Sequence, residues 1–267
     1  MVLDTLSYSE LRAFAAAWGL TQPRILGLFI AVPLFARQAM PGLLRFGLAG
    51  GLGLLAAPPL LAQVAQVPDG LGLALLVTKE AALGFVLGYL LALPFWAFEA
   101  TGFFIDNQRG ASIAATLNPL TGNDSSPLGQ LFNQAFIVFV LVSGAFGLLL
   151  QALYRSYELW PVLHWRPVFA ANGAVLWLGQ LDVLVRTAIL WSSPVIVAMF
   201  LAELGLALVS RFTPQLQVFF LAMPIKSALA MLVLAGYMGL LLGYAGDWTQ
   251  AVFGGATQFL GSTLVGK

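Results

Sequence analysis

The sequence has few charged residues for its length. Only 9% of its 267 residues are Asp, Glu, Lys or Arg, whereas about a quarter are charged in a typical soluble domain. With 60% apolar residues and a mean hydropathy of +0.91, the chain lacks the side chains for a water-facing surface. Most of its outside must therefore face lipid or other protein subunits.

Cysteine is absent, and histidine occurs once, as His164. The chain therefore forms no disulfide or thiolate metal site, and a lone His without a nearby carboxylate cluster is a poor metal ligand. The 12 basic and 11 acidic residues leave a net charge of +1, so there is no basic surface for nucleic acid to follow. No nucleotide-binding loop or pair of catalytic residues is apparent, and we expect no cofactor and no enzymatic activity.

Polar linkers and charge blocks are also lacking. We therefore expect one integral membrane domain over residues 1–267.

Asp4 and Glu10 precede the first basic residue, Arg12. A cleavable signal peptide begins with positive charge instead, so we expect this end of the chain to be retained.

What the sequence does contain is a series of long apolar segments, and a membrane-crossing helix needs about 20 such residues. Four segments carry no charge: 46–67, 81–98, 128–154 and 227–246. Two more are interrupted: 13–36 contains Arg24, and 175–208 is too long for one crossing, so we expect Pro194 to kink or split it. These runs are too long for barrel strands, and residues 247–267 could add a short packed helix. The pattern predicts an all-α membrane protein of about six to eight apolar helices, several of them kinked or broken by proline.

The spacing of small residues and the placement of basic residues add two expectations. Small residues four apart, such as Gly84 and Gly88, allow helices to approach closely. Lys and Arg residues outside six assumed crossings divide equally between the two sides, so they predict no membrane orientation.

Residues 101–134 form the longest polar interval and lie between two apolar segments. Ser126 before Pro127 predicts a helix start, with a loop before it. The interval is either a solvated loop outside the membrane, as composition alone favours, or a re-entrant loop lining a water-filled cavity. Phe103 and Phe104 would suit a loop that packs into a pore and seals it.

Several motifs resemble a known family, the T subunit of type III secretion systems. They are 104–112 (FIDNQRGAS), 118–122 (NPLTG), 126–129 (SPLG), 154–161 (YRSYELWP), 211–219 (RFTPQLQVF) and 223–226 (MPIK). The resemblance extends over most of the chain and includes, more loosely, the flagellar R subunit. The 106–110 and 156–161 stretches favour the injectisome member.

The resemblance implies a function that composition does not. In that family one copy of this subunit joins R- and S-type partners and further export-apparatus proteins in the bacterial inner membrane. Together they form a helical, pore-containing gate for unfolded secreted polypeptides, raised partly out of the membrane towards the periplasm. The polar interval, about 101–127, is similar in position to the family's pore plug. The candidate plug residues are Phe103, Phe104, Asp106, Asn107, Gln108, Arg109, Asn118, Pro119, Gly122 and Asp124.

Charged residues in apolar segments are candidate functional residues because they are costly in lipid. The candidate subunit contacts are Asp182, Arg186, Glu203, Arg211 and Lys226. Asp182 and Arg186 lie four apart, so they can pair locally or bond to a neighbouring subunit. Glu203 and Lys226 can pair with each other across adjacent helices or with charges on partner subunits, the latter being favoured. Four of these residues, all except Arg211, also suit an alternative, a secondary transporter of a small solute with a coupling site near the midplane.

Overall fold

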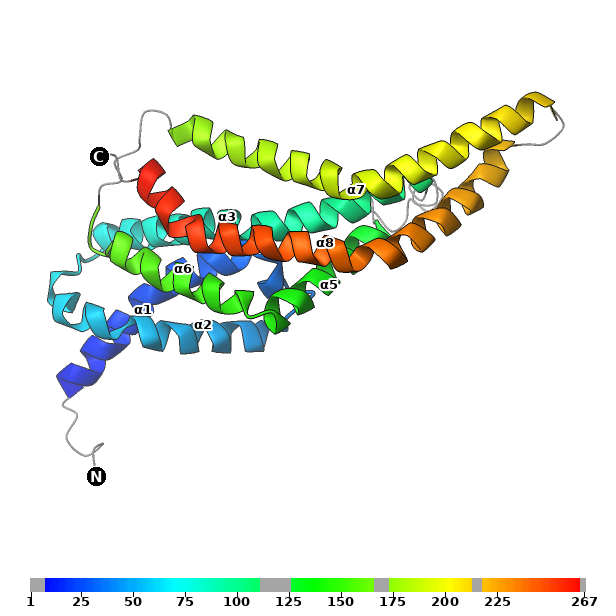
Figure 1. The fold of residues 1–267 in the computed structure, drawn as a ribbon. Helices are drawn as coiled ribbons and strands as arrows, with labels where there is room; N and C mark the ends of the chain where they lie inside the picture. The colour runs from blue at the N-terminus through cyan, green and yellow to red at the C-terminus, as the bar shows by residue number, and fades with distance from the viewer. Residues whose placement is uncertain (1–7, 111–125, 166–172, 213–217, 265–267) are drawn as a thin grey trace. The chain divides into compact units, whose positions relative to one another are not determined.

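A computed structural model describes residues 8–110, 126–165, 173–212 and 218–264. Every regular element in these ranges is a helix, which confirms the predicted all-α class (Figure 1). The α-helices are α1 (Tyr8–Ala31), α2 (Gly42–Ala56), α3 (Leu71–Arg109), α5 (Pro127–Val142), α6 (Ala145–Leu159), α7 (Gly173–Phe212) and α8 (Val218–Leu264). Two 3₁₀ helices, η2 (Pro33–Phe35) and η3 (Pro58–Gln66), flank α2.

The chain divides into two compact units. The first unit comprises Met1–Ala92, Gly144–Leu176 and Gln250–Lys267, and the second comprises Leu93–Ser143 and Trp177–Thr249.

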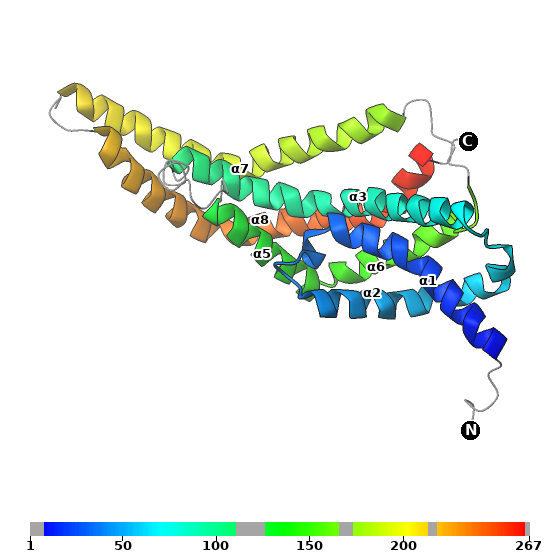
Figure 2. The ribbon, with the colours of Figure 1, turned by 180° about the vertical axis from the view of Figure 1, so that it is seen from behind.

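In the first unit, α1 packs against α2 and η3 (Figure 2). Its buried apolar cluster includes Ala17, Leu20, Ala57, Leu60, Leu76 and Val162. Small residues four apart do not mark a close approach everywhere, since a Cβ on Gly239 or Gly243 of α8 would meet nothing within 4 Å. The predicted close approach is confirmed at Gly84 and Gly88, where an added Cβ would overlap the backbone oxygen of Arg24 or lie 2.8 Å from that of Leu28. The α1 and α3 backbones are thus in direct contact, and only glycine fits there.

Proline breaks one apolar segment of the first unit, as predicted. α2 ends at Ala56, and the chain turns by 71° into η3, which starts at Pro58. Two successive prolines remove backbone donors that a continuing α-helix would need, so the segment proceeds as a 3₁₀ helix.

The second unit contains an aromatic core. Phe98 lies 4.9 Å from Phe136 and 5.1 Å from Phe132 between ring centroids, and Phe95 meets Phe136 edge-on at 5.1 Å. Trp191 on α7 contacts Phe98 at 6.1 Å, so α3, α5 and α7 share this core.

Two sequence expectations concern the last helices. For Pro194, a split of the segment is excluded because α7 continues through this residue, whereas a kink stays a prediction. A proline leaves the carbonyl four residues earlier without its helical donor, and the Ser193 hydroxyl supplies one to Leu190 O at 2.7 Å. Residues 247–264 are not a separate short helix but the end of α8, since no breaker interrupts them.

Within the part of the chain that the structure describes, three helices are long and apolar enough to cross a membrane: Leu71–Arg109, Gly173–Phe212 and Ala222–Thr263. The number rises to 5 if each of two bent pairs, α2 with η3 and α5 with α6, forms one span. This count agrees with a multi-pass membrane protein.

Candidate functional site

The carboxylate of Asp106 joins the end of α3 to the start of α5 in the second unit. One oxygen accepts hydrogen bonds from Ser126 Oγ (2.6 Å) and from the backbone N–H of Leu128 (2.9 Å). The other accepts from Arg109 Nε (2.7 Å) and pairs with Arg109 Nη2 (2.7 Å). Asp106 is only 3% exposed. We call these four residues the Asp106 clamp.

The clamp is favourable because helix N-termini carry unpaired N–H groups and partial positive charge. Asp106 satisfies one of these groups, and Ser126 Oγ accepts from the N–H of Gly129 at 2.9 Å. Ser126 is thus the N-cap of α5 with Pro127 in the first turn, as the sequence predicted. Arg109 in turn neutralises the buried carboxylate.

Close packing of backbone supports the clamp from one turn away. A Cβ on Gly102 would lie 2.7 Å from backbone atoms of Leu128 and Gly129. Asn133 Nδ2 donates to Glu99 Oε2 at 3.0 Å beside this crossing. The junction of α3 and α5 is therefore fixed by both sterics and hydrogen bonds.

The predicted plug region, about 101–127, was expected to be a loop, but its first residues are helical. Phe103 to Arg109 are helical residues of α3, not loop, and the helix ends at Gly110 with φ +85°. Residues 101–109 contain no proline or other strong helix breaker after Gly102, so the helix continues to Arg109 and is followed by a glycine that can adopt a positive φ. Phe103 is 42% exposed and Phe104 half-buried. Asn118, Pro119, Gly122 and Asp124 lie outside the described residues.

A cavity of about 250 Å³ brings together two of the motifs on which the family resemblance depends. It is lined by Asn107, Gln108, Gly110, Glu203, Ala222, Met223 and Lys226. Lys226 Nζ donates to Glu203 Oε2 at 3.1 Å, with the lysine side chain 11% exposed and the glutamate 47%. These two residues are thus paired within the chain, whereas the sequence favoured their pairing with partner subunits. Residues 223–226 belong to α8, and residues 107–110 lie at the end of α3. Only the fold therefore makes the two motifs neighbours.

The other predicted charges on α7 are not part of this cavity. Asp182, Arg186 and Arg211 are exposed, and no ion pair of the described residues joins Asp182 to Arg186. The predicted local pair is therefore not formed, and both side chains stay exposed on α7. Asp182 and Glu203 lie in one helix, roughly 30 Å apart along its axis.

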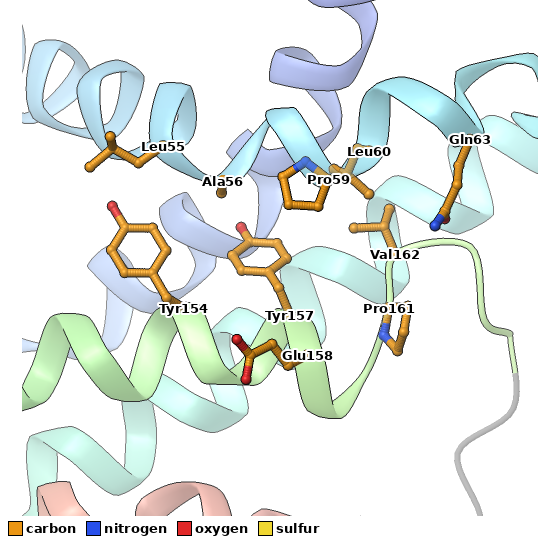
Figure 3. A pocket seen from close by; sticks show the side chains of 10 residues that line it. All are labelled: Leu55, Ala56, Pro59, Leu60, Gln63, Tyr154, Tyr157, Glu158, Pro161 and Val162. Atoms are coloured by element: carbon orange, nitrogen blue, oxygen red, sulfur yellow. The ribbon is translucent and has the colours of Figure 1, made fainter.

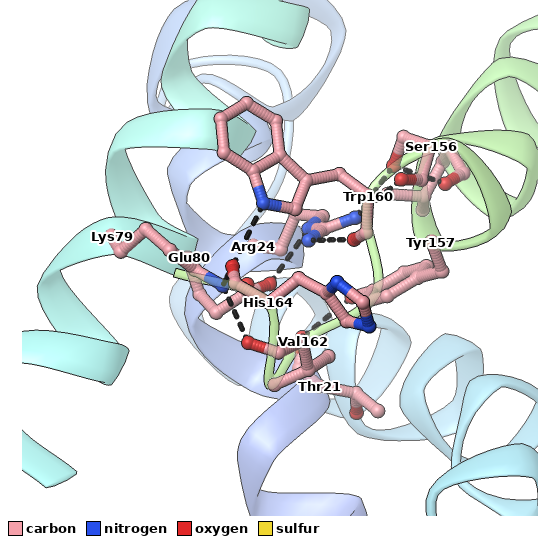
Figure 4. Close-up of polar contacts among 10 residues, drawn as sticks. Thr21, Arg24, Lys79, Glu80, Ser156, Tyr157, Trp160, Val162 and His164 are labelled. Atoms are coloured by element: carbon pink, nitrogen blue, oxygen red, sulfur yellow. Dashed lines mark hydrogen bonds and ion pairs between the residues drawn. The ribbon is translucent and has the colours of Figure 1, made fainter. Parts of the chain in front are cut away.

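The first unit contains a buried charge cluster that the sequence did not predict (Figure 4). Arg24 Nε donates to Glu80 Oε2 at 2.7 Å, and each side chain is 1% exposed. Arg24 also donates to the backbone oxygens of Ser156 (2.7 Å) and Trp160 (2.9 Å). Its guanidinium lies 4.3 Å from the ring centroid of Tyr157. One arginine therefore holds α1, α3 and the end of α6 together.

Lys79 extends this cluster to the segment after α6. Its ammonium lies 2.9 Å from Glu80 Oε1 and donates to the backbone oxygens of Val162 and His164. Trp160 Nε1 donates to the same His164 oxygen at 2.9 Å. Two carbonyls of the 154–161 motif, those of Ser156 and Trp160, therefore accept from the buried Arg24 at the C-terminal end of α6, where partial negative charge favours a cation. A lone arginine in an apolar segment was the available signal, because such a charge needs a partner.

Comparison with known proteins agrees with these motifs. Residues 15–252 match the family described as bacterial export proteins, family 1. The chain is 41% identical over 224 residues to Yop proteins translocation protein T of Yersinia pestis, covering 84% of this chain and 86% of that protein. It is 32% identical over 238 residues to surface presentation of antigens protein SpaR of Salmonella typhimurium, covering 86% of each. Flagellar biosynthetic protein FliR of Bacillus subtilis is 31% identical over 216 residues, covering 79% of this chain and 82% of that protein. The predicted resemblance is confirmed, and the chain belongs to family 1 of the bacterial export proteins.

Proposed function

We propose that this chain is the structural and gating T-type subunit of a type III secretion export apparatus in the bacterial inner membrane. One copy would join R- and S-type subunits around a pore for unfolded secreted polypeptides, in an assembly raised partly towards the periplasm. Support comes from the family and from the higher identity to a Yop translocation protein (41%) than to the flagellar relative (31%).

The observation that carries the gating proposal is the Asp106 clamp. It ties together the two ends of the interval 111–125, so this interval starts and finishes at one fixed point. In the proposed mechanism the plug region obstructs the pore at rest, with Phe103 and Phe104 beside it. An entering polypeptide displaces the plug while the clamp holds its base.

The need for partner subunits is supported by the length of α7. Leu178 and Phe212 are 63% and 84% exposed, and they lie about 50 Å apart along the helix axis. A bilayer core of about 30 Å could cover both only if α7 tilted by about 50°, whereas spanning helices tilt by 0–40°. Other protein would therefore cover part of the apolar surface of α7 in the assembled state.

The alternative, a small-solute transporter, is disfavoured by the placement of its candidate residues. A coupling site requires its charges to converge. Asp182 and Glu203 are instead separated by roughly 30 Å along α7.

Deletion of residues 112–124 in the complete export apparatus tests the gate. We expect normal assembly and a higher resting leak of small solutes across the inner membrane. A deletion of the same kind in the connection between α6 and α7, residues 167–171, serves as the control and should not raise the leak. An unchanged leak in a correctly assembled 112–124 deletion would overturn the plug assignment.

A further inference from the structure

A cavity of about 430 Å³ in the first unit has no role in the proposed gate (Figure 3). It lies between the bent segment α2–η3 and helix α6. Its lining residues are Leu55, Ala56, Pro59, Leu60, Gln63, Tyr154, Tyr157, Glu158, Pro161 and Val162. Its volume is within the usual range for small-ligand sites, about 300–1,000 Å³.

The cavity exists because of the proline break and two tyrosines. The 71° turn after Ala56 leads η3 away from the direction of α2. Tyr154 and Tyr157 extend across the space from α6 (Figure 3). Their hydroxyls donate to the backbone oxygens of Leu52 (3.2 Å) and Thr21 (2.8 Å). The Tyr154 bond therefore ties α6 to α2, and the Tyr157 bond ties α6 to α1.

The lining has the chemistry of a site for an amphiphile that bears an ammonium group. Leucine, proline, valine and alanine side chains supply the apolar wall, and Glu158 supplies the only formal charge. Glu158 forms no ion pair with any residue that the structure describes. Tyr157 already contacts the Arg24 guanidinium, so Tyr154 offers the other aromatic ring to a cation. No Lys or Arg lines the cavity among the described residues, which disfavours a ligand whose net charge is negative.

We propose that this cavity binds an amine-bearing phospholipid, with the headgroup ammonium on Glu158 and the first part of an acyl chain along Leu55, Pro59 and Leu60. Both walls belong to candidate membrane spans, so lipid surrounds them at high concentration. Leu55 is 71% exposed at the rim, which gives a lipid direct access. The inference depends on the chain being in a membrane and not on the gating role.

The test is native mass spectrometry of the full chain released from vesicles that contain equal amounts of phosphatidylethanolamine and phosphatidylglycerol. We expect the wild type to retain the ethanolamine lipid about tenfold or more over the glycerol lipid, as one charge-assisted hydrogen bond would give. Glu158→Gln should abolish the preference, and Glu158→Lys should reverse it. Leu55→Trp, at an exposed position, should fill the cavity and lower retention of both lipids.

Asp69→Asn, which neutralises another exposed acid of the first unit, is the matched control and should keep the wild-type preference. Equal retention of the two lipids by the wild type would overturn the proposal. The proposal would also be overturned if the Glu158→Gln and Asp69→Asn proteins showed the same preference for the ethanolamine lipid. Because lipid retention is measured without secretion, neither result affects the proposed export function.

Discussion

The two units of this protein use buried charge in different ways. In the first unit, Arg24 and Glu80 are each 1% exposed and bond only to other parts of the same unit. In the second, the Asp106 clamp joins the residues on either side of the interval 111–125. The Glu203–Lys226 pair lines a cavity with Asn107 and Gln108, and Glu203 is half exposed. The first arrangement fixes three helices permanently. The Asp106 clamp in the second unit holds the base of the plug region, and the proposed function requires the plug region to move.

Substitutions in the two units should therefore have different effects. Substitutions in the Arg24 cluster should reduce the free energy of unfolding and the amount of protein. Substitutions in the second unit should change leak or secretion at nearly normal protein levels.

The largest effect is expected for Glu80→Gln. It leaves Arg24 buried without its counter-charge, and breaking one partner of a buried ion pair costs about 3–5 kcal/mol. The free energy of unfolding in detergent and the amount of chain in the membrane should both fall. Asp69→Asn, an exposed acid in the same unit, is the control and should change neither. The double variant Arg24→Met/Glu80→Leu should recover part of the loss, and a stable Glu80→Gln protein would contradict the assignment of this cluster to stability.

Gly102→Ala tests the helix crossing below the clamp. The added Cβ would lie 2.7 Å from backbone atoms of α5, so α3 and α5 must separate. Overpacking of this kind costs about 1–3 kcal/mol, which thermal unfolding of the purified chain would detect. Gly236→Ala in α8 is the control, because a Cβ added there would meet nothing within 4 Å. Equal stability of the two variants would mean that the crossing is looser than described.

Asp106→Asn sharpens the comparison between the units. The amide keeps the shape of the side chain but loses the charge that pairs with Arg109 and one of the two acceptor oxygens. We expect a loss of about 1–3 kcal/mol locally, near-normal assembly, and a raised resting leak. Ser126→Ala, which removes only the cap, should cost about 1 kcal/mol and raise the leak less. If the Asp106→Asn apparatus were unstable but did not leak more than the wild type, the clamp would have a structural role like that of the Arg24 cluster in the first unit.

The smallest effect on stability is expected for Glu203→Gln. Because Glu203 is 47% exposed, its pairing with Lys226 should contribute no more than about 1 kcal/mol. The rate of substrate secretion is the informative measurement, since the pair lines the cavity beside Asn107 and Gln108. Asp182→Asn, on the same helix but away from the cavity, provides the comparison. A large loss of stability in Glu203→Gln would show that this pair is structural.

Some local features were predictable because short-range physics decides them. Ser126 caps α5 as expected, since a serine before a proline favours a helix start wherever it occurs. The start of the plug region was predicted wrongly. Polar residues at 101–109 suggested a loop, but polarity does not end a helix, and the chain reverses at Gly110, a glycine with a positive φ.

The sequence by itself determined that this chain is a helical membrane protein, because apolar content and run length fix which surfaces can face water. It also determined the family, through short motifs in a fixed order. Only the tertiary structure decided which charges meet: Arg24 with Glu80, Asp106 with Ser126, and Glu203 with Lys226. The physical reason is that a buried charge needs a partner, but the partner is chosen by how helices distant in the chain pack together.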